Sequence, residues 1–530
     1  MFRANILLVA SFFVLISISM AFYHEMYRPQ LHYSHPTGWL SDPNGLIYIN
    51  DKYHLFHQCR EFDRAHGPMQ WGHAISTDLI HWETKPIAIK PLEGFALYSG
   101  GAILDHKNSS GLQLDKNIPP LIAYICVSNK TSLQQHVWMA YSNDADYIEL
   151  KFYKEEPFIK NFGLKKYFRD PMPIKYKDHY ILIISIQICH AFYKSSDLIK
   201  WELISEFGRE DGAHGGSWEM PSLFPYTVTI DGKECEKYVL TNTRTSFQHP
   251  IHQYFIGSFD GEKFTNDNHR KTELWLDYGP DSFAGNVWYD TPGKRRLWIN
   301  WMGRWEYAIV LKDNAWNGQM GLTRELKSNA VDGKLRLTSY PVDEVKKLRI
   351  HLIDAIKNVN ISTVGHFDIA KGNDNKKHLV DIEMILDLAN FANDNTFDLL
   401  FCGPNDVLKI SFKNNEFTLD RSKAGNSTIP NAEYAQDTPE LTRKKFNSLW
   451  TAPRVITNSI MKLRIIIDAN CIEMFIDEGL SAMSALFYST EDIASKMIIK
   501  VHGDNSEKKS HVHLTELNIY EMKSIWASRQ

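Results

Sequence analysis

The sequence predicts an all-β protein made of a β-propeller followed by a C-terminal β-sandwich. Segments typical of strands dominate up to about residue 340; YILIISIQIC and RRLWINWMG are examples, rich in β-branched and aromatic residues. The same region carries an internal repeat, and a second block of alternating strand segments follows it. At 530 residues the chain is too long for one ordinary core, so two domains are expected.

The internal repeat indicates propeller blades. AISTDLIHWET at 74–84 recurs as YKSSDLIKWEL at 193–203, with weaker copies at 140–150 and 256–265. Each copy has a serine two residues before an aspartate and an apolar or aromatic residue four residues after it; the aspartates are Asp78, Asp144, Asp197 and Asp260. A spacing of roughly 50–65 residues suits a four-stranded blade. A plain β-sandwich is the alternative for this region.

The second domain is predicted from segments such as LRIIIDANCIEMFID, which alternate like half-buried strands of a sandwich. They follow residues 339–358, whose middle has helix-like spacing. We place the boundary near 345–362, with the propeller over 28–345 and the sandwich over 360–530.

The N-terminus resembles a secretory signal peptide over residues 1–21. Arg3 precedes a nearly unbroken apolar run, and Ser19 and Ala21 offer small residues before a cleavage site. The run of about 15 apolar residues is shorter than the ~20 that span a bilayer, so we favour secretion over a membrane anchor. If a eukaryote secretes the chain, four sequons would be glycosylated: Asn108, Asn129, Asn360 and Asn426.

Composition argues against several kinds of partner. The net charge is −4 and no long basic run is present, so we expect no nucleic acid partner. Aromatic residues make up 12% of the chain, which suits strand packing or stacking on sugar rings. The six cysteines are scattered without a C-x-x-C pair, which indicates neither a zinc site nor a disulfide scaffold.

The candidate chemistry lies in three carboxylates. The sequence lacks the usual motifs of phosphoryl transfer, dinucleotide redox, zinc proteolysis and serine-esterase chemistry. Asp42 in WLSDPNG, Asp170 in YFRDPMP and Glu219 in SWEMPSLF each precede a proline directly or with one residue between. Glycoside cleavage needs a proton donor and an ionised carboxylate, which such a set supplies. Taken singly, each acid is more often a turn or surface acid than a catalytic one.

The neighbours of these acids suggest different protonation states. Trp218 and Met220 would raise the pKa of Glu219, as a general acid requires. The Ser41 hydroxyl and the turn amides could keep Asp42 ionised, and the Arg169 charge should hold Asp170 ionised.

Taken together, the segments resemble glycoside hydrolase family 32, the invertases and fructan hydrolases. GWLSDPNGL, FRDP and WEMP match its acid motifs in order, and YHLFHQ, WGHAISTDLIHW, YSGGAIL, LDYGPDSFA, INWMGRW and IEMFIDEG complete the set. The resemblance implies a five-bladed propeller with a pocket at one end of its axis, followed by a sandwich. It also implies Asp42 as nucleophile in a retaining reaction, Glu219 as acid and base, and Asp170 as transition-state stabiliser.

By the same resemblance, the substrate-binding residues would be Trp39, Ser41, Gln58, Trp71, Ser99, Arg169 and Asp281. The tryptophans would offer apolar faces to a sugar, and Gln58 and Asp281 would offer hydrogen bonds. The alternative is that they are core aromatics and turn polar groups. The chain departs from the family at Ser41, where asparagine is usual, and at His66, Met220 and Phe283. These departures suggest a reshaped pocket.

We therefore expect a secreted β-fructofuranosidase that uses no cofactor or metal and hydrolyses sucrose or a related fructoside. One alternative is a sugar-binding homologue that has lost turnover. Others are a fructosyltransferase that uses the same intermediate and a related pentose-acting propeller hydrolase. The oligomeric state stays open.

Overall fold

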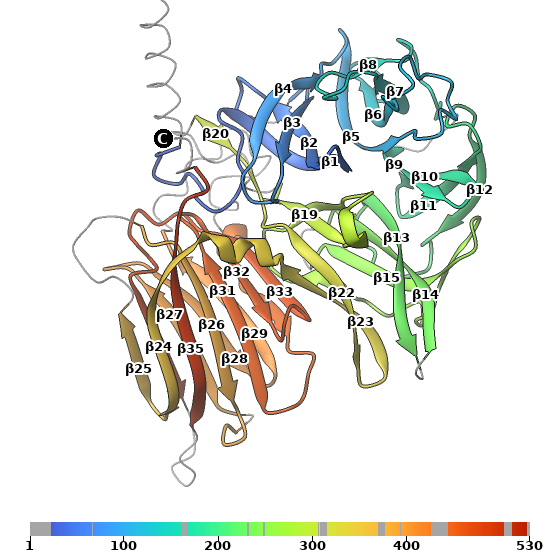
Figure 1. The fold of residues 1–530 in the computed structure, drawn as a ribbon. Helices are drawn as coiled ribbons and strands as arrows, with labels where there is room; N and C mark the ends of the chain where they lie inside the picture. Colours follow the sequence, from blue (N-terminus) through green and yellow to red (C-terminus); the bar gives the residue numbers. More distant parts are fainter. Residues whose placement is uncertain are drawn as a thin grey trace, which may run out of the picture.

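A computed structural model describes residues 23–65, 67–161, 167–230, 233–246, 250–305, 307, 315–368, 377–392, 394–425, 444–502 and 511–526. The expected signal peptide at 1–21, His66 and the Asn426 sequon lie outside these residues. The regular secondary structure of the described residues is almost entirely β, in a propeller and a sandwich that lie side by side (Figure 1). The predicted fold class is confirmed. No helix in the described ranges is long and apolar enough to cross a membrane.

Five antiparallel sheets form the blades of the propeller. The first blade holds β1 (Gly38–Ile49), β2 (Lys52–Arg60), β3 (Gln70–Ser76) and β4 (Glu83–Ile89). The second holds β5 (Phe95–Leu104), β6 (Leu121–Asn129), β7 (Gln135–Ser142) and β8 (Lys151–Phe152). The third holds β9 (Arg169–Tyr176), β10 (His179–Ile186), β11 (Cys189–Ser195) and β12 (Glu202–Phe207).

The fourth blade holds β13 (Trp218–Ile230), β14 (Lys233–Arg244), β15 (His252–Phe259) and β16 (Phe264–Asn266), with β17 (Trp275–Asp277) beside β15. The fifth holds β18 (Phe283–Val287), β19 (Leu297–Met302), β22 (Arg324–Val331) and β23 (Lys334–Pro341), with β21 (Gln319–Met320) beside β19. A short 3₁₀ helix, η1 (Pro292–Lys294), lies between β18 and β19.

The repeated Ser-x-Asp segment forms the turn that follows the third strand in each of the first four blades. In the first blade the Asp78 carboxylate accepts the backbone N–H groups of Ile80 and His81 and the hydroxyl of Ser76. Asp197 does the same with Ser195 and the following amides. The fifth blade has a tight turn between β22 and β23 at the corresponding place. The repeat therefore marks four of the five blades.

The inner strands of the five blades, β1, β5, β9, β13 and β18, contact one another in a ring. Two links join the fifth blade to the first. The segment β20 (Trp316–Asn317) pairs in parallel with the start of β1. At the other end of β1, Ile47 forms a parallel bridge with Tyr289. The inner strands thus start at one end of the propeller and finish at the other.

The sandwich consists of two six-stranded sheets. One contains β24 (Arg349–Ile361), β35 (Val512–Met522), β26 (Val380–Asp387), β31 (Ile460–Ile467), β32 (Cys471–Ile476) and β33 (Ser481–Leu486). The other contains β25 (Val364–Asp368), β34 (Lys496–His502), β27 (Thr396–Cys402), β28 (Val407–Lys413), β29 (Glu416–Lys423) and β30 (Trp450–Pro453). Buried aliphatic and aromatic side chains fill the space between the sheets.

The sandwich begins earlier than the expected residue 360. Its first strand, β24, starts at Arg349, and the helix-like spacing before it corresponds to a short 3₁₀ helix, η2 (Asp343–Leu348). We did not predict this strand from the sequence because β24 is an edge strand whose residues are mostly exposed or half-buried. Such a strand does not need the apolar alternation that marks a buried face.

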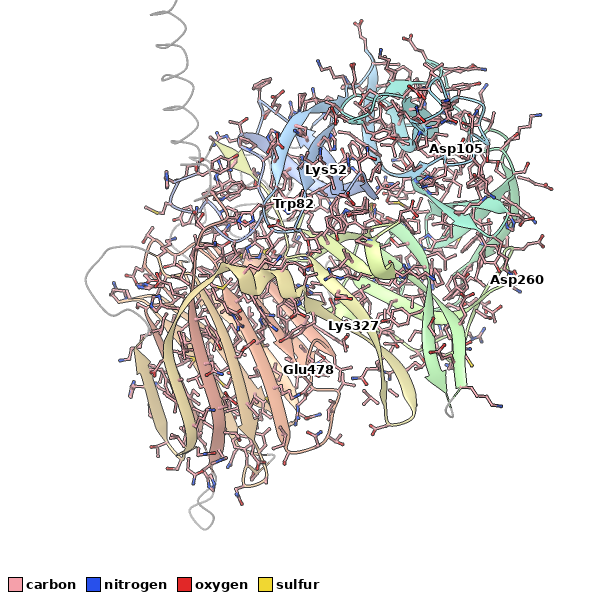
Figure 2. All side chains as sticks on the ribbon, viewed as in Figure 1. Lys52, Trp82, Asp105, Asp260, Lys327 and Glu478 are labelled. Carbon is pink, nitrogen blue, oxygen red and sulfur yellow. The ribbon has the colours of Figure 1, made fainter. Side chains whose placement is uncertain are left out.

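The two domains meet through buried ion pairs. Arg324 on β22 binds Asp277 of the propeller at 2.8 Å and Glu473 of the sandwich at 3.2 Å, and all three side chains are fully buried. Figure 2 labels Lys327 on β22 and Glu478 on the turn after β32, two elements near this junction. Next to Glu478, the Gly479 carbonyl accepts the amide of Ser339 on β23.

Candidate active site

A β-bulge interrupts the inner strand of every blade at a similar position. In β1, Ser41 and Asp42 together face one residue of β2, Gln58, because the register slips between Leu40 and Pro43. Bulges in the other inner strands contain Tyr98–Ser99, Asp170–Pro171, Met220–Pro221 and Ala284–Gly285. A bulge re-aims the side chains next to it.

The bulges bring the three predicted acids together. Asp42 and Asp170 lie within their bulges, and Glu219 immediately precedes the bulge of β13. The backbone amide of Met220 donates to Asp170 at 3.0 Å, which links the third and fourth blades. Asp170 and Met220 both have left-handed backbone, with φ of 56° and 51°. Such strain in non-glycine residues is often found at functional sites.

Asp42 is held by a hydroxyl from the second blade. Ser99 Oγ donates to Asp42 Oδ2 at 2.7 Å, and Gln58 Nε2 donates to Ser99 Oγ at 3.2 Å. Burial raises the pKa of Asp42 to about 6, the Ser99 hydrogen bond opposes that rise, and the Glu219 charge adds to it. Asp42 is therefore mostly ionised at neutral pH.

The expected role of Ser41 is not met. Its hydroxyl accepts a hydrogen bond from Trp39 Nε1 at 3.0 Å, and Ser41 is buried. Ser99 supplies the hydrogen bond that we expected from Ser41.

Arg169 pairs with Glu219 and not with the adjacent Asp170. Arg169 Nη1 lies 2.5 Å from Glu219 Oε1. Burial raises the pKa of Glu219, as expected for a general acid, while Arg169 opposes the rise. Burial and the Glu219 charge raise the pKa of Asp170 to about 8, with Arg169 only partly opposing them. The expectation that Arg169 keeps Asp170 ionised is therefore wrong.

Trp39 and Trp71 do not present open faces to a ligand. Both side chains are fully buried. Trp71 Nε1 donates to the Tyr98 carbonyl at 2.9 Å, next to Ser99. Trp39 stacks on Trp305 with ring centroids 5.9 Å apart. In this structure the two indoles pack behind the bulges and support them.

Asp281 lies at the junction of the two domains. Its carboxylate binds Arg421 of the sandwich, the Tyr307 hydroxyl and the backbone amide of Leu486. These partners occupy both of its oxygens. The expectation that Asp281 binds fructose is therefore corrected, because a propeller loop directs its side chain toward the sandwich.

Comparison with known proteins identifies the family. The model described as the glycosyl hydrolases family 32 N-terminal domain matches residues 32–341, and the model of the family's C-terminal domain matches residues 344–521. The chain belongs to glycosyl hydrolase family 32.

The relatives of this glycosyl hydrolase include enzymes named for fructans. A levanase of Bacillus subtilis is 32% identical over 521 residues, covering 96% of this chain and 72% of the levanase. An extracellular exo-inulinase of Aspergillus niger is 28% identical, covering 96% of this chain and 98% of the relative.

Solved structures agree with the fold of this family 32 hydrolase. The exo-inulinase of Aspergillus awamori superposes with a TM-score of 0.81 at 25% identity, over 95% of this chain and all of the other. A fructofuranosidase of Schwanniomyces occidentalis complexed with fructosylnystose gives a TM-score of 0.78 at 25% identity, over 95% of this chain and 99% of the other.

Three aromatic residues that contact Trp39 or Arg169 of the hydrolase were not predicted individually from the sequence. Trp305 is half-buried and packs on Trp39 and Trp301. The Arg169 guanidinium lies 4.4 Å from the Tyr167 ring centroid and 5.9 Å from that of Tyr98. Two of them could have been predicted from their place in the sequence next to predicted site residues. Tyr98 directly precedes Ser99, and Tyr167 lies two residues before Arg169.

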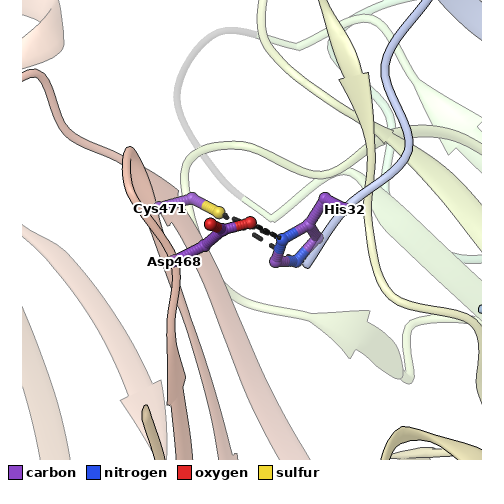
Figure 3. A group of neighbouring side chains, drawn as sticks. All are labelled: His32, Asp468 and Cys471. Carbon is purple, nitrogen blue, oxygen red and sulfur yellow. Dashed lines mark hydrogen bonds and ion pairs between the residues drawn. The ribbon is translucent and has the colours of Figure 1, made fainter. Parts of the chain in front are cut away.

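One buried group of the hydrolase has the residue types of a metal site. His32, Asp468 and Cys471 lie together between the N-terminal segment and the sandwich (Figure 3). His32 Nδ1 is 2.7 Å from Asp468 Oδ2, and the same carboxylate accepts the backbone amides of Gln30 and Leu31. These hydrogen bonds join the N-terminal segment to the sandwich. All six cysteines lie in the described ranges and none is in a disulfide.

Proposed function

We propose that the chain is a retaining β-fructofuranosidase that hydrolyses terminal β-D-fructofuranosyl residues of sucrose or related fructosides. The observation that carries the proposal is the gathering of Asp42, Asp170 and Glu219 on the bulged inner strands. Their hydrogen bonds and raised pKa values suit a nucleophile and a proton donor.

In the first step, Asp42 attacks the anomeric carbon of the fructosyl group and forms an ester with it. The bond to the leaving oxygen breaks, and Glu219 gives that oxygen its proton. Burial, by raising the pKa of Glu219, favours the protonated form that this step needs.

In the second step, Glu219 takes a proton from water, which attacks the ester and releases fructose and free Asp42. Arg169, paired with Glu219, stabilises the carboxylate that exists between the steps. Asp170 and Arg169 would also bind fructose hydroxyls, with Gln58 and Ser99 holding Asp42 in position. The half-buried Trp305 offers an apolar face for the sugar.

The printed names of the relatives support a fructoside substrate, since they are a levanase, exo-inulinases and an invertase. We propose secretion, based on the apolar N-terminal segment and on the relatives called extracellular. The partner is then a small sugar or the end of a fructan chain.

The test is to incubate the secreted protein with sucrose, levan and inulin and to measure free fructose and glucose. We expect fructose release from at least one substrate, and Asp42→Asn and Glu219→Gln should each lower kcat by several orders of magnitude. Glu478→Gln, a change at an exposed turn acid, should keep wild-type activity. Products longer than the substrate would indicate transfer, and a folded protein without any turnover would indicate a binding homologue.

A further inference from the structure

A pocket lies at the end of the propeller ring away from the three acids. It has a volume of about 450 Å³ and is lined by all five blades. The inner strands contribute Ile47, Ile103, Ile174 and Phe224, and Tyr289 follows β18. This size falls within the ~300–1,000 Å³ that is usual for sites of small molecules.

This pocket is separate from the catalytic acids. Ile47, Ile174 and Phe224 lie four or five residues further along the strands that carry the acids, which corresponds to roughly 13–17 Å of strand. Between the two ends, Ser222 Oγ donates to Asn286 Oδ1 at 2.9 Å, and both residues are buried. This buried polar contact between the fourth and fifth blades lies between the acids and the pocket.

The floor of the pocket is apolar. Phe224, Leu223 and Trp288 are almost fully buried, and Ile103 and Ile174 lie beside them. The ligand must therefore carry a hydrophobic body that fits against these side chains.

The charged groups around this floor are mostly cations. Arg296 is half-buried, its Nε donates to the Pro225 carbonyl at 3.0 Å, and its guanidinium lies 6.0 Å from the Phe224 ring centroid. Among the ion pairs of the described residues, none joins Arg296 to a carboxylate. The rest of the guanidinium is free to bind an acid.

Lysines surround the rim of the pocket. Lys107, Lys175 and Lys177 line it and form no ion pair within the described ranges, and Lys175 Nζ lies 3.7 Å from the Tyr180 ring centroid. Only two acids, Glu236 and Asp290, line the pocket with them, and Asp290 lies 4.0 Å from His106. The lining is therefore positive in a protein whose net charge is −4.

We propose that this pocket binds a small organic carboxylate with an apolar body, whose carboxylate pairs with Arg296. A guanidinium presents two parallel N–H donors that match the two oxygens of a carboxylate. The lysines would attract the anion to the mouth of the pocket. A neutral sugar fits less well, because it would leave the surplus of positive charge in the lining without an anionic partner.

The test uses trans-cinnamate and its neutral analogue cinnamamide, titrated into the full-length protein by calorimetry. We expect saturable binding of cinnamate and at least tenfold weaker binding of cinnamamide. Arg296→Gln should abolish the preference for the anion, and Arg296→Lys should keep part of it. Lys357→Gln, a change on the sandwich strand β24, should bind like the wild type.

A second readout separates this site from the catalytic one. Fructose should not displace bound cinnamate, and Arg296→Gln should hydrolyse sucrose at the wild-type rate. If Arg296→Gln does not fold, as judged by circular dichroism, Lys175→Gln replaces it and should weaken cinnamate binding severalfold.

Several results would overturn the proposal. These are no binding of cinnamate, 1-naphthoate or octanoate to the folded protein, equal binding of cinnamamide, or displacement by fructose. An unchanged anion preference in Arg296→Gln would do the same. None of them bears on the proposed hydrolase activity, which the fructose-release assay tests separately.

Discussion

The ionisation of Asp42 depends on a balance between burial and one hydroxyl from another blade. Burial raises the pKa of this carboxyl group to about 6, and the hydrogen bond from Ser99 limits that rise. The Ser99 hydroxyl is in turn held by Gln58. A positioned hydroxyl thus keeps the proposed nucleophile charged near neutral pH.

Ser99→Ala should move the acidic limb of kcat/KM to higher pH. The limb reports protonation of Asp42, and loss of a hydrogen bond to the charged form raises its pKa by about one unit. The measurement is the pH profile of sucrose hydrolysis by the free enzyme. Ser76→Ala, which changes a turn serine in the first blade, is the control, and an unmoved limb in Ser99→Ala would contradict the assignment.

Asp42→Asn should stabilise the folded protein at pH 7 while removing turnover. The folded-state pKa lies above the ordinary 3.8, so folding stability falls as pH rises from about 4 to about 6. Above that window the charged carboxylate costs about 2–3 kcal/mol. Urea unfolding at pH 7 should show the gain and at pH 3.5 should not. Equal effects at both pH values would exclude this explanation.

The acids could be predicted from the sequence, but not the groups that bind them. Turn chemistry and motif order identified Asp42, Asp170 and Glu219. Sequence neighbours were the wrong partners, because Asp42 and Asp170 lie in bulges that re-aim their side chains. Ser99 binds Asp42 and Arg169 binds Glu219 across blades, and single-sequence patterns do not reveal such contacts.

At the scale of elements, the β-bulge explains why a proline stands at or near each acid. Pro43, Pro171 and Pro221 lie in or beside a register slip of an inner strand. Proline has no backbone N–H, so it is tolerated where the ladder of hydrogen bonds is broken. The acid-proline segments are therefore signs of bulges as well as of turns.

The Ser-x-Asp turn should contribute measurably to blade stability. Asp197→Ala removes the acceptor of two backbone amides and of the Ser195 hydroxyl, which should cost about 1–2 kcal/mol. The measurement is urea unfolding at neutral pH. Asp178→Ala, at an exposed acid in the turn between β9 and β10, should change stability little. Similar losses in both variants would contradict the role of the turn.

The sequence repeat predicted propeller blades because each copy forms the same Ser-x-Asp turn. For the same reason, the repeat could reveal only the blades that contain this turn. The fifth blade has a different turn, so only the family resemblance predicted this blade. The edge strand β24 has a mostly exposed surface, so its pattern gave no strand signal. Buried strands of the sandwich, such as β32, were visible because they had to be apolar.

At the scale of the whole molecule, buried charges join the propeller to the sandwich. Arg324 bridges Asp277 and Glu473, and Arg421 reaches from the sandwich to Asp281. The pKa of Glu473 is lowered: burial alone would raise it, but the Arg324 charge, the His32 imidazole and the hydrogen bond from the Leu322 amide together outweigh burial. Its contribution to stability is therefore present at neutral pH and is lost as pH falls through that lowered pKa.

Arg324→Met should destabilise the protein by about 3–5 kcal/mol, because it removes the guanidinium that pairs with two buried carboxylates. Scanning calorimetry at neutral pH is the measurement, and the loss should shrink at low pH where the acids are protonated. Arg209→Met, which breaks an exposed pair with Glu206, is the control and should cost less than about 1 kcal/mol. An effect of Arg324→Met no larger than the control would exclude a strong interface.

The most direct test of the mechanism is to trap the fructosyl group on Asp42. Glu219→Gln, incubated with β-fructofuranosyl fluoride, should form the ester without needing a proton donor and should hydrolyse it slowly. Intact mass spectrometry should then show a gain of one fructosyl group, and peptide mapping should place it on the peptide that contains Asp42. An unmodified enzyme that still consumes the fluoride, or a label on another residue, would contradict the account.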